Sequence, residues 1–171
     1  SGAFSGWQAL DGRTMSDTIL KRRDTCYACP VRCKRVVEIE GGTYPVDPAY
    51  GGPEYETLAT LGSYCGVDDL AAVSRANQLC NSLGMDTISC GATIAWAMDC
   101  YEKGFLTRED TGGLDLRFGN ADAMLKAVHA GGGMVYVCNP CNPTGGVLRK
   151  SELISFIRKV PGDVIIVVDE A

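Results

Sequence analysis

The chain contains 171 residues, of which 46% are hydrophobic and 22% are charged, and its formal net charge is −5. This composition indicates a folded globular protein and excludes a disordered one, and the negative charge disfavours nucleic-acid binding, which requires a basic face. No apolar run approaches the roughly 18 residues of a membrane span, and the first residues lack the basic and apolar regions of a signal peptide. We therefore expect a cytoplasmic protein with no membrane partner.

The first 20 residues carry three glycines and are predicted to form a loop. Ser16 is predicted to cap a short helix that runs through residues 21–23. Beyond the cysteines that follow, residues 35–40 and 43–46 flank a Gly41-Gly42 pair, which predicts a β-hairpin because glycine readily adopts the positive φ of a two-residue turn.

A tight loop contains Cys26, Cys29 and Cys33 in a C-x2-C-x3-C spacing, and the chain has nine cysteines in all. Without an export signal these thiols are expected to be reduced, and thiolates at this spacing can reach three corners of one metal centre. We interpret the loop as an iron–sulfur site. The alternatives are a zinc site, a disulfide with one spare thiol, and chance in a cysteine-rich chain. The candidates for a fourth ligand within the chain are Cys65, Cys80, Cys90 and Cys100.

Basic residues at positions 32, 34 and 35 adjoin the thiols. They offset the negative charge of a thiolate-bound cluster and could dock an acidic redox partner. A solvated positive surface is the simpler interpretation.

Three helices are predicted next, over residues 54–64, from Asp68 as N-cap to Gly84, and from Asp86 as N-cap to Gly104. A fourth covers residues 120–130. The second helix is expected to bury Leu70, Val73, Ala76 or Asn77, and Cys80, and the third to bury Ile88, Gly91, Ala95 and Met98.

The pattern changes after the glycines at 131–133. Apolar runs at 134–138 and 164–169 are typical of buried parallel strands, and Ser151 is predicted to cap a helix over 152–159 between them. Strand, helix and strand over about 36 residues form a βαβ unit. The predicted fold class is therefore α+β, with a mainly helical domain and a small hairpin at 1–130 and a βαβ segment at 131–171.

The first 130 residues resemble the tungsten-containing aldehyde ferredoxin oxidoreductases. The resemblance rests on four motifs in order, which are Cys26-Tyr27-Ala28-Cys29-Pro30-Val31-Arg32-Cys33-Lys34-Arg35, Gly52-Pro53-Glu54-Tyr55-Glu56-Thr57-Leu58, Cys80-Asn81-Ser82-Leu83-Gly84-Met85-Asp86-Thr87-Ile88-Ser89 and Leu114-Asp115-Leu116-Arg117-Phe118-Gly119-Asn120. It implies oxidation of an aldehyde to a carboxylic acid, with ferredoxin as the electron acceptor. It also implies that the parent enzyme could form a homodimer.

The resemblance also implies roles for particular residues. Cys26, Cys29 and Cys33 would bind a [4Fe–4S] cluster beside a tungsten (or molybdenum) bis-pterin cofactor. In the family, the fourth cysteine ligand of the cluster lies further downstream. Glu54 or Glu56 would accept a proton near the metal, although acids also favour a helix N-terminus for electrostatic reasons.

A pterin-binding pattern, which in the family usually opens with Asp, is implied for Asn81, Gly84 and Asp86. The same three residues are equally typical of a helix end followed by an N-cap.

Residues 133–171 resemble the pyridoxal-phosphate aminotransferases, histidinol-phosphate aminotransferase most closely, through Met134–Gly146 and Val164–Ala171. This implies that Asn142 hydrogen-bonds the cofactor's ring oxygen and that Asp169 pairs with its pyridinium nitrogen, which makes the ring an electron sink. The sequence thus predicts two enzyme fragments joined near Gly131, by natural fusion or by an artefact, with little activity of their own. The leading function is an aldehyde ferredoxin oxidoreductase fragment. An aminotransferase fragment and a non-catalytic cysteine-rich metal-binding module are the alternatives.

Overall fold

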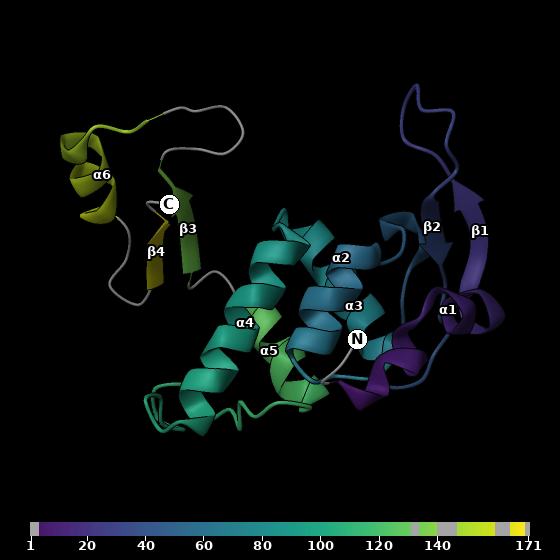
Figure 1. Ribbon diagram of the computed structural model, residues 1–171, viewed down its shortest axis with the longest axis horizontal. Helices are drawn as coiled ribbons and strands as arrows, with labels where there is room; N and C mark the ends of the chain where they lie inside the picture. Colours follow the sequence, from purple (N-terminus) through teal and green to yellow (C-terminus); the bar gives the residue numbers. More distant parts are fainter. Residues whose placement is uncertain (1–3, 131–133, 140–146, 160–164, 170–171) are drawn as a thin grey trace. The chain divides into compact units, whose positions relative to one another are not determined.

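A computed structural model describes residues 4–130, 134–139, 147–159 and 165–169. Contacts within the chain separate it into two compact units, Ser1–His129 and Ala130–Ala171, and each is described by itself (Figure 1). No helix of the described ranges is long and apolar enough to cross a membrane.

The first unit opens with a 3-10 helix, η1 (Ser5–Leu10), and helix α1 (Gly12–Thr18). Asp11 caps α1 by accepting a hydrogen bond from the backbone N–H of Thr14 at 2.7 Å. The predicted helix through residues 21–23 is wrong, because Ser16 lies inside α1, where its hydroxyl donates to the Gly12 carbonyl. Residues 20–24 instead form strand β1 (Leu20–Asp24).

Strand β1 pairs with β2 (Lys34–Val37) in an antiparallel ribbon that encloses the cysteine loop. The predicted hairpin about Gly41-Gly42 is reduced to one bridge between Ile39 and Val46, although both glycines adopt the expected positive φ. A second strand cannot extend far here because Pro45 has no N–H to donate to a ladder. The principal partner of β2 is therefore the strand that precedes the cysteines.

Four helical segments follow, as predicted. After a short 3-10 turn, η2 (Pro48–Tyr50), these are α2 (Tyr55–Thr57) continuing into the π-helix η3 (Leu58–Tyr64), α3 (Leu70–Leu83), α4 (Thr87–Glu102) and α5 (Ala121–Ala130). Asp69, one residue beyond the predicted Asp68, caps α3 by accepting from Ala71 and Ala72. Asp86 caps α4 as predicted, through the Ser89 N–H at 2.7 Å.

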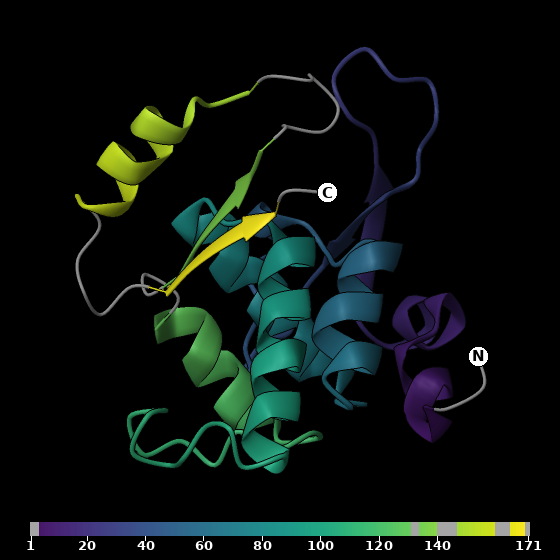
Figure 2. The ribbon, with the colours of Figure 1, turned by 60° about the vertical axis from the view of Figure 1, so that its left-hand side comes forward.

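The core of this unit lies between η3, α3, α4 and α5. The predicted stripe of α3 is buried, including Cys80. On α4, Gly91 and Met98 are buried as predicted, but Ile88 is 40% exposed, Ala95 is only half-buried, and Ile94 is buried instead. Helix α4 lies alongside η3 (Figure 2).

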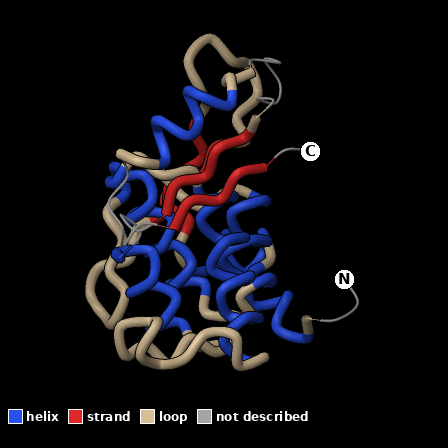
Figure 3. Tube along the Cα trace, turned by 90° about the vertical axis from the view of Figure 1, so that its left-hand side faces the viewer, coloured by secondary structure: helices blue, strands red, loops and turns tan. Residues whose placement is uncertain are grey.

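The second unit contains β3 (Met134–Cys138), α6 (Lys150–Ile157) and β4 (Ile165–Asp169). The strands are parallel and side by side, with Met134 opposite Ile165 and Cys138 opposite Asp169, which confirms the βαβ prediction (Figure 3). The prediction that Ser151 is the N-cap is wrong, because the helix begins two residues earlier than predicted, at Lys150, and Arg149 is its N-cap. The Glu152 carboxylate accepts from the Arg149 backbone N–H at 2.9 Å and from its guanidinium at 2.8 Å.

Candidate metal and cofactor site

The cysteine loop, residues 25–33, connects β1 to β2 at the surface. Cys26 and Cys33 are exposed, Cys29 is half-buried, and all three are free thiols. The Cys29 N–H donates to the Cys26 carbonyl at 3.1 Å, which closes a turn around Ala28 at φ 57°. A non-glycine residue rarely adopts this left-handed conformation, so the turn is held by its surroundings.

Thr25 fixes the base of this turn. Its hydroxyl lies within hydrogen-bonding distance of three loop carbonyls, those of Cys26 (3.3 Å), Cys29 and Val31 (3.2 Å). These carbonyls are drawn inward to one point. One hydroxyl thus contacts three carbonyls of the loop, while two of the three thiols are exposed.

The donor set of the loop fits an iron–sulfur cluster because thiolates are the ligands that such clusters take. Among the described residues, no three cysteine, histidine or acidic side chains are grouped closely enough to share a metal ion. The assignment of Cys26, Cys29 and Cys33 to a metal thus rests on the type and spacing of the donors.

Positive charge gathers where the loop returns to β2. The Arg32 guanidinium donates to the Arg23 carbonyl at 3.0 Å, and the Arg35 guanidinium donates to the carbonyl of Cys33. Arginine keeps its charge at any physiological pH. Both side chains would therefore offset the charge of thiolates on this loop.

The acidic motif is placed next to β2 by two glycines. A Cβ at Gly52 would lie 2.8 Å from a methyl group of Val37, and one at Gly51 would lie 3.5 Å from the Arg35 carbonyl. Gly51 also adopts φ 74°. Only glycine permits this approach at position 52, and it delivers Glu54 to the start of α2 beside the strand that follows the thiols.

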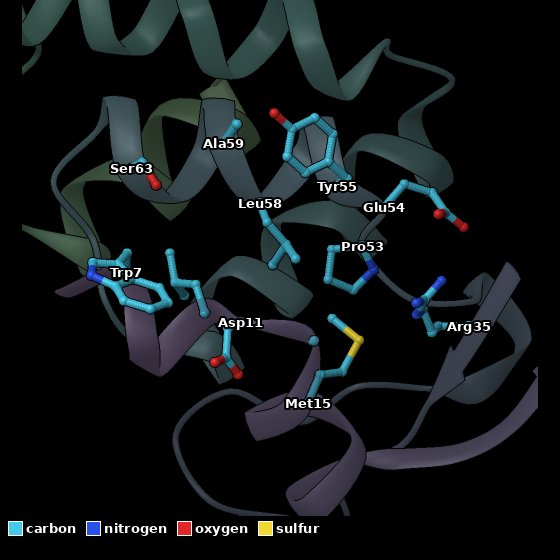
Figure 4. A pocket seen from close by; sticks show the side chains of 12 residues that line it. Trp7, Asp11, Met15, Arg35, Pro53, Glu54, Tyr55, Leu58, Ala59 and Ser63 are labelled. Carbon is cyan, nitrogen blue, oxygen red and sulfur yellow. The ribbon is translucent and has the colours of Figure 1, made fainter. Parts of the chain in front are cut away.

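A hollow of about 440 Å³ opens beside this junction. Its floor is apolar, and Figure 4 shows Glu54 and Arg35 on one side of it and Trp7 and Ser63 on the other. Glu56 does not line it, and both acids are exposed. The two acids thus differ in position, since Glu54 alone borders a cavity. The full lining is Trp7, Leu10, Asp11, Gly12, Met15, Arg35, Pro53, Glu54, Tyr55, Leu58, Ala59 and Ser63.

Asn81 ties the third motif to the second. Its side-chain amide donates to the Tyr50 carbonyl at 3.3 Å, and Tyr50 directly precedes the two glycines that position Glu54. The structure therefore brings together the segments that carry Asn81 and Glu54, and β2 connects them to the thiol loop.

Gly84 and Asp86 form the turn from α3 to α4. Gly84 has φ 70°, and the Met85 N–H donates to the Cys80 carbonyl at 2.8 Å, as in a Schellman motif. Asp86 caps α4. Both residues are exposed and have these structural roles whether or not they touch a cofactor.

The residues predicted for the second cofactor lie at the edge of the described chain. Asn142 lies outside the described residues. Asp169 is the last residue of β4, at the carboxyl end of a parallel strand. Ligands commonly bind at this end of parallel sheets.

The candidate fourth ligands lie elsewhere. Cys65 and Cys80 are fully buried, and Cys90 and Cys100 are half-buried. Burial raises the pKa of Cys65 to about 12, so it is held as a thiol. It donates hydrogen bonds to the carbonyls of Thr60 and Gly91 at 3.4 and 3.7 Å.

Sequence reasoning missed Thr25 and Trp7. A threonine that directly precedes a cysteine turn is a signal for side-chain hydrogen bonds to the turn. Trp7 carries no comparable signal, because nothing in the pattern of residues 1–20 indicates that this segment borders Glu54.

The first unit thus presents three free thiols on one loop, and Arg35 of the strand that follows this loop lines a hollow that Glu54 borders. Residues 1–132 match the family model described as "Aldehyde ferredoxin oxidoreductase, domains 2 & 3", and the chain belongs to this family. It is 39% identical over 125 residues to the tungsten-containing aldehyde ferredoxin oxidoreductase of Thermococcus kodakarensis, covering 72% of this chain and 20% of the relative. It is 41% identical to the Pyrococcus furiosus protein of the same name, with the same coverage. The chain thus spans about a fifth of the length of these relatives.

The later residues match a different family. Residues 106–171 match the model "Aminotransferase class I and II", which overlaps the first match at 106–132. The chain is also 32% identical over 123 residues to an aromatic amino acid aminotransferase of Rhodococcus jostii, covering 67% of this chain and 34% of the relative. The predicted similarity to aminotransferases is confirmed at this level.

Proposed function

We propose that the chain is part of an aldehyde ferredoxin oxidoreductase that oxidises aldehydes to carboxylic acids. Cys26, Cys29 and Cys33 hold a [4Fe–4S] cluster, a tungsten (or molybdenum) bis-pterin lies nearby, and ferredoxin accepts the electrons. Family membership and the printed names of the relatives support the proposal.

The observation that carries it is that Arg35 of β2 connects the thiol loop to the hollow that Glu54 borders. Arg35 of β2 donates to the Cys33 carbonyl and also lines the hollow that Glu54 borders. Asn81 reaches the same segment through Tyr50.

Oxidation of an aldehyde with water yields a carboxylic acid, two electrons and two protons. When bound, the metal–pterin group would supply the two-electron oxidation and a cluster on Cys26, Cys29 and Cys33 would supply electron transfer. Glu54 accepts a proton at its carboxylate, because it borders the hollow whereas Glu56 does not. The apolar floor of the hollow, which includes Leu10, Met15 and Leu58, excludes water from the aldehyde's hydrocarbon part.

Asn81, Gly84 and Asp86 contact the pterin in this proposal. The positive φ of Gly84 turns the chain sharply, and the absence of a side chain there leaves open space on the loop, since a Cβ would meet nothing within 4 Å. A flat ring can approach the backbone at such a position.

The metal assignment is tested by anaerobic reconstitution of the chain with iron and sulfide. We expect bound iron and sulfide-to-iron absorption in the unaltered chain and loss of most of both in Cys29→Ser. Cys100→Ser is the matched control, because Cys100 is a half-buried free thiol outside the loop. Equal iron in both variants would refute the assignment, and retention of zinc in place of iron would favour a non-catalytic metal-binding module.

The choice between the acids is tested in the complete protein purified anaerobically from its source. Glu54→Gln should lower aldehyde-dependent reduction of a viologen dye by about 10²- to 10⁴-fold, the usual contribution of a general base, with metal content unchanged. Glu56→Gln is the control and should retain activity within a few fold. Equal losses in the two variants would contradict the role of Glu54.

A second function is favoured by the βαβ unit. Its parallel strands place Asp169 at a carboxyl end, and residues 106–171 match aminotransferases. In this proposal Asn142 and Asp169 bind pyridoxal phosphate. A protein carrying these residues should then show the cofactor's absorption band and lose it in Asp169→Ala; a colourless protein after incubation with pyridoxal phosphate would exclude this function.

A further inference from the structure

Strand β1, the cysteine loop and β2, residues 20–37, form a strongly basic ribbon. This basic ribbon carries six basic side chains and a single acid, Asp24, in a chain whose formal net charge is −5. The rest of the chain is therefore acidic, and positive charge is concentrated here. Figures 1 and 2 show the cysteine loop projecting beyond the ends of both strands. The six basic residues are Lys21, Arg22, Arg23, Arg32, Lys34 and Arg35.

Most of this positive charge has no acidic partner in the part of the chain that the structure describes. Lys21 forms an ion pair with Glu38, and Arg22 pairs with Asp24 at 3.2 Å. For the other four cations of the basic ribbon, no described carboxylate lies within 4.0 Å of the side-chain nitrogens. The chain thus leaves several exposed cations without a neutralising acid.

The pairing of the strands adds to this imbalance. Arg23 of β1 lies directly opposite Arg35 of β2. Like charges in directly opposite positions destabilise an antiparallel strand pair. The Arg32 guanidinium, which donates to the Arg23 carbonyl at 3.0 Å, brings a third positive charge to the same place. An anionic partner bound here would relieve this repulsion.

The tip of the basic ribbon is apolar and exposed. Tyr27 is fully exposed and Val31 is 59% exposed, and Cys29 lies between them in the sequence. Protein interfaces commonly surround an apolar centre with a polar rim, and tyrosine and arginine carry much of their affinity. The acidic remainder of the chain disfavours a long polyanion such as nucleic acid. These features together indicate a small protein with one acidic face.

We propose that the basic ribbon, with Tyr27 and Val31 at its tip, is the docking surface for a small acidic electron-carrier protein. The inference rests on the proposed function, because the carrier is the ferredoxin that accepts the electrons. It goes beyond that function by naming the residues that bind the carrier and the charges that attract it. Arg23 and Lys34 attract carboxylates of the carrier, and the Tyr27 ring packs against it.

Docking at this surface brings the carrier to the thiols of the proposed cluster. Cys26 directly precedes Tyr27 and is exposed, so a carrier that covers Tyr27 also covers this thiol. For each aldehyde oxidised with water to the acid, two carriers take one electron each and two protons are released. Attraction between opposite charges mainly raises the rate of association. The charges should therefore affect kcat/KM for the carrier and leave kcat unchanged.

Kinetics of the complete protein, purified anaerobically, test the proposal. The double variant Arg23→Gln, Lys34→Gln should lower kcat/KM for ferredoxin by about 10-fold at low salt, which is within the range of electrostatic steering. The difference should largely disappear at about 0.5 M salt, where the screening length falls to about 4 Å. Reduction of methyl viologen, a dication without an acidic face, should be unchanged or slightly faster, with iron content unchanged.

The double variant Arg13→Gln, Lys103→Gln is the matched control. It removes two exposed charges outside the basic ribbon, where Arg13 pairs with Asp17 and Lys103 pairs with Asp99. This variant should keep kcat/KM for ferredoxin within about twofold of the unaltered protein, since neither site faces the carrier. Equal losses in the two double variants, a loss that persists at high salt, or an equal loss of viologen reduction would overturn the proposal.

The apolar tip is tested by Tyr27→Ala. This variant should lower kcat/KM for ferredoxin several-fold at low and at high salt, because contacts of an apolar ring are not screened by ions. Phe105→Ala is its control, because Phe105 is 76% exposed and lies outside the basic ribbon. Equal effects of the two substitutions on ferredoxin would remove Tyr27 from the docking surface.

Direct binding separates failure of this inference from failure of the proposed function. Calorimetric titration of oxidised ferredoxin into the complete protein needs no turnover, and Arg23→Gln, Lys34→Gln should weaken binding about 10-fold at low salt and little at about 0.5 M. A protein that reduces viologen with aldehyde but binds ferredoxin independently of these charges retains the proposed function and refutes the docking surface. A protein without aldehyde-dependent reduction refutes the proposed function, and the titration alone then decides whether the basic ribbon binds the carrier.

Discussion

Asn81 has a structural reason to be an amide. Its N–H group donates to the Tyr50 carbonyl, and a carboxylate at this position could only accept. The family pattern usually opens with Asp, so the departure is compensated by a contact that Asp cannot make. This contact fixes the segment before Glu54, so the Asn81 side chain helps to position the motif that contains Glu54.

Ser74 is a buried hydroxyl without a hydrogen-bond partner among the described residues. Leaving such a group unpaired costs about 1–3 kcal/mol, and alanine is also the better helix former in α3. We predict that Ser74→Ala raises the free energy of unfolding by about 1 kcal/mol, measured by urea denaturation.

Ser82→Ala is the matched control because Ser82 lies on the same helix, is exposed, and donates to the Leu79 carbonyl at 2.9 Å. Its effect should stay within about 0.5 kcal/mol, as is usual for surface positions. A Ser74→Ala chain less stable than the unaltered one would show that the hydroxyl has a partner.

Tyr44 links the segment after β2 to α5. Its hydroxyl donates to the Asp122 carboxylate at 2.6 Å, and this bond, with burial, raises the pKa of Tyr44 to about 12. Between the unfolded and folded pKa values the folded chain holds a proton that the unfolded chain has released, so the stability that this bond contributes is complete below about pH 10 and is lost as the pH rises through about 12.

We predict that the difference in unfolding free energy between the unaltered chain and Tyr44→Phe narrows when urea denaturation is repeated at about pH 11 instead of about pH 9. In an Asp122→Asn background, the stability difference caused by Tyr44→Phe should change less between about pH 9 and about pH 11. The reason is that this substitution removes the charge that opposes ionisation of Tyr44. A difference independent of pH would mean that the Tyr44–Asp122 bond does not persist in solution.

At the scale of elements, the contact between α4 and η3 depends on Gly91. A Cβ there would lie 2.7 Å from the Leu61 nitrogen and from the Thr60 carbonyl carbon, and both are backbone atoms that cannot rotate away. Overpacking of this kind costs about 1–3 kcal/mol and exceeds the gain of about 1 kcal/mol from alanine's helix propensity. We predict that Gly91→Ala destabilises the chain by about 1–2 kcal/mol in thermal or urea unfolding.

Gly12→Ala supplies the comparison for this prediction. Gly12 is also in a helix, α1, but a Cβ there meets nothing within 4 Å. This substitution should be neutral or slightly stabilising, by up to about 1 kcal/mol. Equal stability of the Gly91→Ala and Gly12→Ala chains would contradict the inference that α4 packs closely on η3 at Gly91.

Local signals determined which elements could be predicted. Asp86 and Gly84 act through hydrogen bonds and dihedral angles within their own turn, so the end of α3 and the start of α4 were predicted correctly. Strand β1 could not be predicted in this way, because its conformation depends on β2, which lies beyond the cysteine loop. Pairing across an intervening loop leaves little trace in the sequence of either strand.

In the candidate site, too, local features could be predicted from the sequence, whereas features that depend on tertiary packing could not. The spacing of Cys26, Cys29 and Cys33 predicts a donor set without further information. The choice between Glu54 and Glu56 could not be made from sequence, because both acids stand at one helix start. The structure distinguishes them, because Glu54 lines the hollow and Glu56 does not.

At the scale of the whole molecule, the first unit has a hydrophobic core of its own. Among the described residues, its cluster of buried side chains runs from Leu10 to Val128. The helical unit therefore has the core that independent folding requires. The domain boundary near Gly131 remains a prediction that this observation makes testable.

We predict that residues 1–130 alone fold with nearly the thermal midpoint of the full chain and retain the same iron after reconstitution. The physical reason is that α5, which supplies buried Ala123, Met124 and Val128, stays in place. A chain ending at Asn120 is the contrast, because it lacks these buried side chains. Each of the larger ones contributes about 2–5 kcal/mol to stability. Their combined loss exceeds the stability of a small domain, so this chain should not fold stably. Calorimetry on the three chains decides the matter: if residues 1–130 unfold as readily as 1–120, residues 131–171 are needed for the helical unit to fold, and the two family matches describe one cooperative domain.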